Sequence, residues 1–355
     1  MPKSAYIHIP FCKSKCKYCS FISFPNLELK KDYLDALKRE IKNNYKGELL
    51  NTLYFGGGTP SLLSVEEFRE LINLFNTNVC TEITAELNPE TLTQEYFKGL
   101  KNAGVNRISL GCQTFDDEIL KLIGRRHDSK QVESAVSMAK DAGFENISLD
   151  FIYGLPNQTL DGFEKDLKHA IALGVQHISL YGLKIDDGCY FASHYPKNLP
   201  DDDIQADMYL KAIEILKDFE HYEVSNFGKP SRHNLNYWNC ENYYGFGAAA
   251  HGYLDDIRFS NAKTIEKYIQ NPLFHCEEKR LTAQEKLEEE IFLGFRKMKG
   301  VDIQSINQKY DIDFEQKYSN ILKRYSQFFI KTDKGYSLNI HGIMISNVIL
   351  SEFLQ

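Results

Sequence analysis

Three cysteines near the N-terminus constrain this chain more than any other feature of its sequence. Cys12, Cys16 and Cys19 have the spacing C-x3-C-x2-C and directly follow a short apolar segment that we expect to be a β-strand. A loop with this spacing can place three thiolates around one face of a cuboidal iron–sulfur cluster. Four irons with three protein ligands leave one iron open, and an open iron can bind a substrate or a cofactor.

Two other interpretations of these cysteines stay open from spacing alone. A structural zinc site usually takes four ligands, and the second C-x2-C half is missing here, although Cys80, Cys112 or His8 could complete a tetrahedron. The thiols could also carry no metal. The chain has eight cysteines and no signal-peptide hydrophobic region, which indicates a reducing cytoplasm rather than a disulfide framework.

Length and charge narrow the class of protein. The 355 residues suffice for one large domain and a smaller one, and contents of 43% hydrophobic and 26% charged residues are typical of globular proteins. No apolar run reaches the roughly 18 residues that span a bilayer, so we expect a cytoplasmic protein. The formal net charge of −7, and the ten basic and ten acidic residues in 281–355, argue against nucleic-acid binding.

Strand and helix patterns alternate through the first half of the chain. Six short, nearly continuous apolar segments predict strands buried on both faces of a parallel sheet: residues 5–9, 52–57, 82–88, 107–112, 146–153 and 177–183. Amphipathic patterns between them predict helices over residues 31–45, 65–75, 94–101, 131–140 and 160–172. The alternation predicts an α/β fold with right-handed crossovers.

The unusual residues of this region lie at or just beyond the ends of the predicted strands. They are Cys12, the run Gly56-Gly57-Gly58-Thr59, Glu86, Gln113, Asp150 and Lys184. In a barrel these ends converge on one mouth, whereas an open sheet would spread them along an edge. We therefore expect a TIM-like barrel, and six units instead of eight make it a partial (β/α)6 barrel.

The pattern changes after residue 200. We expect three parts: the barrel over residues 1–200, a capping extension over 201–280 that is rich in Gly, Asn and aromatic residues, and a C-terminal domain over 281–355. Helical patterns followed by a turn-linked pair of β segments predict a winged-helix-like domain. Its balanced charge favours a packing or partner-docking role.

The motifs together resemble a known superfamily. Residues 6–21 and 56–61 are similar to the radical S-adenosylmethionine (SAM) superfamily, and the similarity continues through 108–115, 124–127, 149–156 and 222–253. More narrowly, they resemble the branch that contains oxygen-independent coproporphyrinogen III oxidase and the HemW-type heme chaperones. The resemblance implies a radical SAM barrel, a [4Fe–4S] cluster held by Cys12, Cys16 and Cys19, SAM at the open iron, and an electron donor.

The resemblance also implies a set of SAM contacts. These are Tyr6, Tyr18, Gly57, Gly58, Thr59, Glu86, Gln113, Arg125, Asp150, Lys184 and His251. The chemistry of the side chains agrees, because carboxylates suit ribose hydroxyls and an arginine suits the SAM carboxylate. From residue type alone, Glu86 and Asp150 could equally be solvated loop acids, and Arg125 a surface cation.

A second motif lies in the expected capping extension. This segment matches the H-N-x-x-Y-W motif that is associated with heme in the chaperones, and it reads His233-Asn234-Leu235-Asn236-Tyr237-Trp238. By this resemblance His233 is a heme ligand, and Tyr237 and Trp238 pack on the porphyrin. A hydrogen-bonded histidine among packed aromatic rings is the alternative. Cys240 is a further candidate heme contact, with an ordinary buried thiol as its alternative.

One position separates the two members of the branch. The oxidase carries a fourth cysteine two residues after the third, and this chain has Phe21 there. The resemblance therefore implies a heme chaperone that delivers heme to acceptor proteins such as respiratory enzymes, including acceptors at a membrane. The alternatives are the oxidase itself, an oxidoreductase that decarboxylates coproporphyrinogen III with SAM-derived radicals, and a zinc-stabilised interaction protein. Whether the chain is an enzyme stays open.

Overall fold

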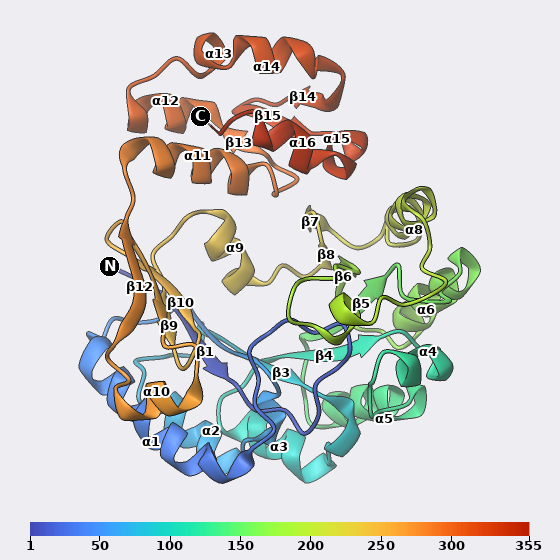
Figure 1. The fold of residues 1–355 in the computed structure, drawn as a ribbon, viewed down its shortest axis with the longest axis vertical. Helices are drawn as coiled ribbons and strands as arrows, with labels where there is room; N and C mark the ends of the chain where they lie inside the picture. The colour runs from blue at the N-terminus through green and yellow to red at the C-terminus, as the bar shows by residue number, and fades with distance from the viewer. Residues whose placement is uncertain (355) are drawn as a thin grey trace.

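A curved sheet of nine strands organises the computed structural model, which describes residues 1–354 (Figure 1). Its strand order is β7-β8-β6-β5-β4-β3-β2-β1-β9. The strands are β1 (Ser4–Ile9), β2 (Thr52–Gly57), β3 (Glu82–Leu87), β4 (Arg107–Gln113), β5 (Ile147–Tyr153), β6 (His177–Gly182), β7 (His221–Glu223), β8 (Asn226–Gly228) and β9 (Tyr244–Phe246). Strands β1 to β6 pair in parallel in chain order, which confirms the predicted partial (β/α)6 barrel.

Three short strands extend the barrel at its two edges. Strand β9 pairs in parallel with β1, and β8 and β7 continue the sheet antiparallel beyond β6. Within residues 1–354, β7 and β9 remain the edges of the sheet, so the barrel is not closed.

Helices cover the convex side of the sheet (Figure 1). They are α1 (Lys30–Asn44), α2 (Val65–Ile72), α3 (Gln94–Asn102), α4 (Asp117–Leu122), α5 (Ser129–Asp141), α6 (Leu160–Ala172) and α8 (Asp202–Ile215). The short helix α7 (Tyr190–Ser193) lies instead beside the cysteine loop, where Phe191 N donates to Lys17 O (3.0 Å). Side-chain caps set where several of them begin: Ser64 and Asp128 form capping boxes, and Thr93 and Thr159 each accept one backbone N–H.

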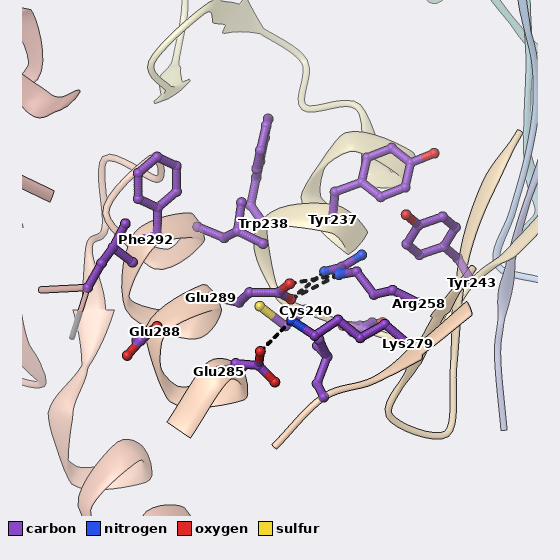
Figure 2. A pocket seen from close by; sticks show the side chains of 14 residues that line it. Tyr237, Trp238, Cys240, Tyr243, Arg258, Lys279, Glu285, Glu288, Glu289 and Phe292 are labelled. Carbon is purple, nitrogen blue, oxygen red and sulfur yellow. Dashed lines mark hydrogen bonds and ion pairs between the residues drawn. The ribbon is translucent and has the colours of Figure 1, made fainter. Parts of the chain in front are cut away.

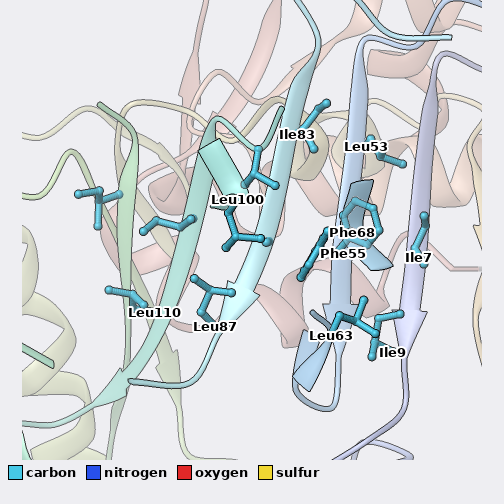
Figure 3. Close-up of a cluster of buried hydrophobic side chains, with 14 of the residues drawn as sticks. Ile7, Ile9, Leu53, Phe55, Leu63, Phe68, Ile83, Leu87, Leu100 and Leu110 are labelled. Carbon is cyan, nitrogen blue, oxygen red and sulfur yellow. The ribbon is translucent and has the colours of Figure 1, made fainter. Parts of the chain in front are cut away.

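Apolar and polar residues alternate along the parallel strands. Ile7, Leu53 and Phe55 face the helices, where Phe68 of α2 and Leu100 of α3 pack against the sheet (Figure 3). The intervening positions point to the inside of the barrel, because successive side chains of a strand lie on opposite faces. Many of these are buried and polar: Ser4, His8, Thr52, Glu82, Thr84, Arg107, Ser109, Ser148, His177 and Ser179. The strands are buried on both faces as predicted, but the inner face is polar.

Helix α9 (Arg232–Trp238) lies on the inner side of the sheet. Glu82, the first residue of β3, accepts the backbone N–H groups of Arg232 (3.2 Å) and His233 (3.1 Å). A carboxylate at this place satisfies N–H groups that a helix leaves free at its start. Thr52, the first residue of β2, also contacts this helix through the ring of His233. Because Glu82 and Thr52 begin their strands, the start of α9 fills the barrel at the end opposite to the predicted mouth.

A second sheet flanks the β9 edge. It contains β10 (His251–Leu254), β11 (Ile257–Asn261) and β12 (His275–Arg280), all antiparallel, and α10 (Ile265–Gln270) follows β11. Glu40 of α1 joins these parts from a buried position. It accepts hydrogen bonds from Gly247 N (2.8 Å), Asn261 Nδ2 (2.7 Å) and Tyr268 Oη (2.5 Å).

The C-terminal region has its own core around Ile291, Phe295, Phe314 and Phe353. Its elements are α11 (Ala283–Gly294), β13 (Val301–Asp302), α12 (Ile303–Tyr310), α13 (Phe314–Lys317), α14 (Ser319–Arg324), β14 (Phe329–Lys331), β15 (Gly335–Leu338), α15 (Ile340–Met344) and α16 (Ser346–Ser351). The antiparallel order β13-β15-β14 beside helices is the predicted winged-helix-like arrangement. The domain boundaries at 200 and 280 stay predictions. Among residues 1–354, no helix has the length and apolar character needed to cross a membrane.

The Glu40 contacts predict a large cost for its removal. In Glu40→Ala the buried donors Gly247 N and Tyr268 Oη lose their acceptor, and Asn261 Nδ2 loses one of its three acceptors. We therefore expect the free energy of unfolding to fall by about 2–4 kcal/mol. Urea denaturation followed by circular dichroism measures this. Glu66→Ala is the control, because Glu66 pairs with Arg69 on the exposed surface of α2 and its loss should cost less than about 1 kcal/mol. Equal losses in the two variants would contradict a joining role for Glu40.

Candidate functional site

A cavity of about 430 Å³ lies at the carboxyl ends of the parallel strands. A volume of roughly 300–1,000 Å³ is usual for small-molecule sites. Twelve predicted residues line it: Cys12, Cys16, Tyr18, Cys19, Gly57, Gly58, Thr59, Glu86, Gln113, Arg125, Asp150 and Lys184. The structure thus brings most of the predicted set to one place.

Two predicted contacts lie outside the lining of this cavity. The hydroxyl of Tyr6 pairs with Nδ1 of His8 (3.0 Å), and Tyr6 stacks near Tyr54 with ring centroids 6.0 Å apart. His251 is an exposed residue at the start of β10. Both assignments stay predictions.

The cysteine loop is tied to the barrel by backbone hydrogen bonds. Cys12 N donates to Phe24 O (3.1 Å), and Lys17 N donates to Ile123 O (2.9 Å). These bonds hold both ends of the loop above the strand ends. Cys12 Sγ lies 3.3 Å from Thr59 Oγ1, and burial raises the pKa of the Cys19 thiol.

Cys12, Cys16 and Cys19 are free thiols at one cavity, and thiolates are the usual ligands of an iron–sulfur cluster. Among the side chains described for residues 1–354, no three of the types His, Cys, Asp and Glu lie close enough to hold one metal ion. A cuboidal cluster places each thiolate on a different iron, so its ligands stand farther apart than the ligands of one zinc ion. The candidates for a fourth zinc ligand are also engaged or remote. His8 Nε2 pairs with Ile22 O (3.2 Å), Cys112 is buried in β4, and Cys80 is exposed.

The cysteine loop and the end of the second strand approach each other closely at Gly58. A Cβ atom added there would lie 2.7 Å from Phe11 O and 3.0 Å from Cys12 Sγ. Its neighbour Gly57 has a φ of +113°, a conformation that residues with side chains rarely adopt. The glycines therefore let the cysteine loop rest on the end of β2.

Two carboxylates stand on the wall of the cavity. Glu86 accepts a hydrogen bond from Tyr54 Oη (2.8 Å) and one from Gly57 N (3.1 Å), and burial raises its pKa to about 7. Asp150 accepts hydrogen bonds from the hydroxyls of Ser109 (2.9 Å) and Ser148 (3.1 Å), and burial raises its pKa as well. Both carboxylates are held in place by neighbours and face the same space.

Arg125 brings a positive charge to the cysteine loop. Its Nη2 donates to Gly111 O (2.7 Å) and Asn88 Oδ1 (3.0 Å), and its Nη1 donates to Cys16 Sγ (3.6 Å). Its Nε is buried and has no hydrogen-bond partner within residues 1–354, which leaves a donor for a bound acceptor. Lys184 is exposed at the mouth and pairs with Asp186 (2.8 Å).

The sequence analysis missed several residues that line the cavity. They are Tyr54, Asn88, Arg107, Ser109, Ser179, Tyr181 and Asn234. Asn88 directly follows β3, so the strand-end rule could have found it. Arg107 and Ser109 alternate with apolar residues of β4, and the prediction of a nearly continuous apolar strand over residues 107–112 makes no use of this alternation.

His233 is enclosed by the strands and by its own helix. Its ring stacks on Tyr54 (centroids 4.9 Å apart), Nδ1 pairs with Thr52 Oγ1 (2.8 Å), and Nε2 pairs with Tyr237 Oη (2.7 Å). The residue is 1% exposed, and burial lowers its pKa to about 3. A neutral imidazole with both nitrogens paired has none free for iron while α9 keeps this position. Heme ligation by His233 stays a prediction.

Comparisons with known proteins assign the family. A family model described as the radical SAM superfamily matches residues 6–170, and one described as the HemN C-terminal domain matches residues 281–339. The chain is 39% identical to heme chaperone HemW of Lactococcus lactis, covering 95% of both chains. It is 36% identical to heme chaperone HemW of Bacillus subtilis, covering 99% of both. The chain belongs to the HemW family.

A further relative agrees with this assignment, and one solved structure has the same fold. Heme chaperone HemW of Escherichia coli is 38% identical over 71% of this chain and 70% of that protein. The structure of the radical SAM enzyme coproporphyrinogen III oxidase, HemN, from Escherichia coli matches 100% of this chain and 90% of its own, with a TM-score of 0.87 and 23% identity. That likeness shows the shared fold. Membership in the superfamily implies a [4Fe–4S] cluster and SAM.

The close approach at Gly58 predicts a specific defect. In Gly58→Ala the added methyl group collides with Phe11 O and Cys12 Sγ, so we expect reconstituted protein to bind less than half the wild-type amount of iron and sulfide. Chemical assay of both elements measures this. Gly162→Ala is the control, since a Cβ on this glycine of α6 meets only Thr159 Oγ1, at 3.2 Å. Full cluster loading in Gly58→Ala would contradict the proposed packing.

Proposed function

We propose that this protein is a heme chaperone of the radical SAM type, which binds heme and delivers it to acceptor proteins such as respiratory enzymes, including acceptors at a membrane. The observation that carries the proposal is 39% identity, over 95% of both chains, to a protein named heme chaperone HemW. The cavity at the strand ends supports a cluster and SAM as part of the same protein.

We assign the cluster to the thiolates of Cys12, Cys16 and Cys19, and SAM to the other side chains of the same cavity. When bound, the cluster supplies an open iron for the amino and carboxylate groups of SAM and one electron for its reduction, which an electron donor must provide. Arg125, through its unpaired Nε, suits the SAM carboxylate. Glu86 and Asp150 suit the ribose hydroxyls and the cationic groups. Tyr18, Gly57, Gly58, Thr59, Gln113 and Lys184 complete the wall, with Tyr6 and His251 as further candidates.

Phe21 favours a chaperone over an oxidase. The oxidase-type motif has a fourth cysteine at this place, and here an aromatic side chain that is 66% exposed lines the cavity beside the cysteine loop. An apolar ring offers no thiol for radical or acid–base chemistry.

Two assays on the reconstituted protein test this function. We expect hemin to quench the fluorescence of Trp238, the single tryptophan of the chain, and the loaded protein to pass heme to an apo-cytochrome. With coproporphyrinogen III, SAM and a reductant, we expect no protoporphyrinogen. Appearance of protoporphyrinogen would support the oxidase function instead. If the protein neither binds hemin nor converts coproporphyrinogen III, both the chaperone and the oxidase function are contradicted.

The raised pKa of Glu86 predicts pH-dependent binding of SAM. With a pKa of about 7, Glu86 is largely protonated at pH 6 and largely ionised at pH 8. A cationic ligand favours the ionised form, so we expect the SAM affinity to rise by up to about tenfold over this range, since one pKa unit corresponds to about 1.4 kcal/mol.

Equilibrium binding at several pH values measures that rise. Glu86→Gln should show a smaller increase, because the amide does not titrate. Glu90→Gln is the control and should keep the wild-type increase, as Glu90 pairs with Lys13 and Arg126 outside this cavity. An unchanged profile in Glu86→Gln would remove Glu86 from the SAM site.

A further inference from the structure

A row of hydrogen bonds leads from Asp150, at the cavity of the strand ends, into the interior of the barrel. Ser148 Oγ donates to Asp150 Oδ1 (3.1 Å) and also pairs with His177 Nδ1 (2.8 Å). His177 Nε2 pairs with Tyr222 Oη (2.8 Å), which accepts the backbone N–H of Ser231 (3.1 Å). Of these five residues only Asp150 lines the cavity, and the other four are buried. We call them the Asp150 network.

The register of the sheet brings these side chains together. Ser148 and Asp150 are two residues apart in β5, so both point to the inside of the barrel. Ser148 stands beside His177 of β6 in the parallel pairing. Tyr222 belongs to β7, and Ser231 is the N-cap residue of α9. The network therefore joins β5, β6, β7 and the start of α9.

The network has a direction, because each of its three middle groups has one hydrogen to donate. Burial, and after it the charge of Arg107, hold the pKa of His177 well below its usual range, so the ring is neutral and carries one N–H. An ionised carboxylate only accepts, and a cationic ligand favours the ionised form of Asp150. The Ser148 hydroxyl then donates to Asp150, and His177 Nδ1–H donates to Ser148. The Tyr222 hydroxyl donates to His177 Nε2.

The other tautomer of His177 would break this row. With the hydrogen on Nε2, Nδ1 accepts the Ser148 hydroxyl, which is then lost to Asp150. The Tyr222 hydroxyl would also lose its acceptor, since within residues 1–354 it pairs only with His177 and with the N–H of Ser231. Arg107 Nη2, at 3.4 Å from Nδ1, would gain one long hydrogen bond. A buried donor without a partner costs more than such a bond returns, so the structure favours Nδ1–H.

We propose that His177 is a positioning residue of the SAM site, which directs the Ser148 hydroxyl onto Asp150 and so fixes this carboxylate for the ligand. The inference rests on the proposed function and deepens it, because it names buried residues behind the cavity that decide how Asp150 is presented. Ser109 and Ser179 also bond to this carboxylate. We therefore expect loss of the Ser148 bond to weaken SAM binding and not to abolish it.

The test measures SAM affinity by equilibrium dialysis on full-length protein with its cluster reconstituted. In Ser148→Ala we expect the affinity to fall about three- to tenfold, which is the usual worth of one hydrogen bond. Ser4→Ala is the matched control. Ser4 is also a buried serine, and its hydroxyl donates to Asn236 Oδ1 (3.0 Å) in another part of the barrel, so this variant should bind SAM as the wild type does.

A double-mutant cycle separates positioning from a general structural role. We expect His177→Leu to lower SAM affinity about as much as Ser148→Ala does, and to have almost no further effect when it is added to Ser148→Ala. A distorted barrel would lower the affinity by the same factor in both backgrounds, which would contradict the inference.

Nuclear magnetic resonance tests the tautomer directly. In protein labelled with ¹⁵N at histidine, the ring signals of His177 are those that disappear in His177→Leu, and their shifts tell which nitrogen carries the hydrogen. We expect it on Nδ1. A hydrogen on Nε2 would overturn the inference.

Trp238 reports whether the variants leave α9 in place. It is the single tryptophan of the chain, its ring lies 4.7 Å from Arg296 Cζ, and it borders a separate cavity of about 690 Å³ between α9 and α11 (Figure 2). No residue of the Asp150 network lines that cavity. An unchanged emission spectrum in His177→Leu shows that a displaced helix is not the cause of weaker SAM binding. If the emission shifts, Ser148→Ala alone decides.

The outcomes separate this inference from the function on which it rests. If the wild type binds SAM and Ser148→Ala binds it equally well, the inference is overturned and the proposed function stands. If the wild type binds no SAM, the SAM site of the proposed function fails by itself.

Discussion

The polar inner face of the parallel sheet is the constraint on which the rest of this structure depends. Each strand directs apolar residues to the helices, and the alternate residues, among them Glu82, Arg107 and Ser109, are buried inside the barrel. Buried polar groups are costly unless they are paired. At the start of the strands Glu82 is paired by the first turn of α9. Toward their ends Glu86 and Asp150 face a cavity, where a ligand can meet them.

The same face connects the two motifs of the chain. The ring of His233 stacks on Tyr54, Tyr54 donates to Glu86, and Glu86 accepts the backbone N–H of Gly57. Asn234 of α9 also lines the cavity at the strand ends. Residues of the H-N-x-x-Y-W segment thus contact residues of the cavity at the strand ends directly.

Much of this could be predicted from the sequence. The six strands, the mouth of the barrel and the cysteine loop follow from local patterns. Each such pattern lies within one short segment of the sequence and can be recognised there without knowledge of the fold. The polar inner face was not predicted because the strands are short. In β4, which has seven residues, the sequence pattern does not clearly separate an apolar run from an alternation of Arg107, Ser109 and Gln113 with apolar neighbours. The surroundings of His233 were beyond reach, since Thr52 and Glu82 lie 181 and 151 residues away in the chain. Contacts between residues that are so far apart in the sequence depend on the tertiary fold and leave no local sequence pattern.

The most direct test of this interpretation is the electron paramagnetic resonance spectrum of the reduced, reconstituted protein with and without SAM. The central claim is that Cys12, Cys16 and Cys19 hold a [4Fe–4S] cluster whose open iron faces the SAM cavity. We expect a signal from a reduced cluster whose g-values shift when SAM is added, and no such signal in Cys16→Ala. A cluster signal that is identical with and without SAM, or one that survives in Cys16→Ala, would contradict the claim.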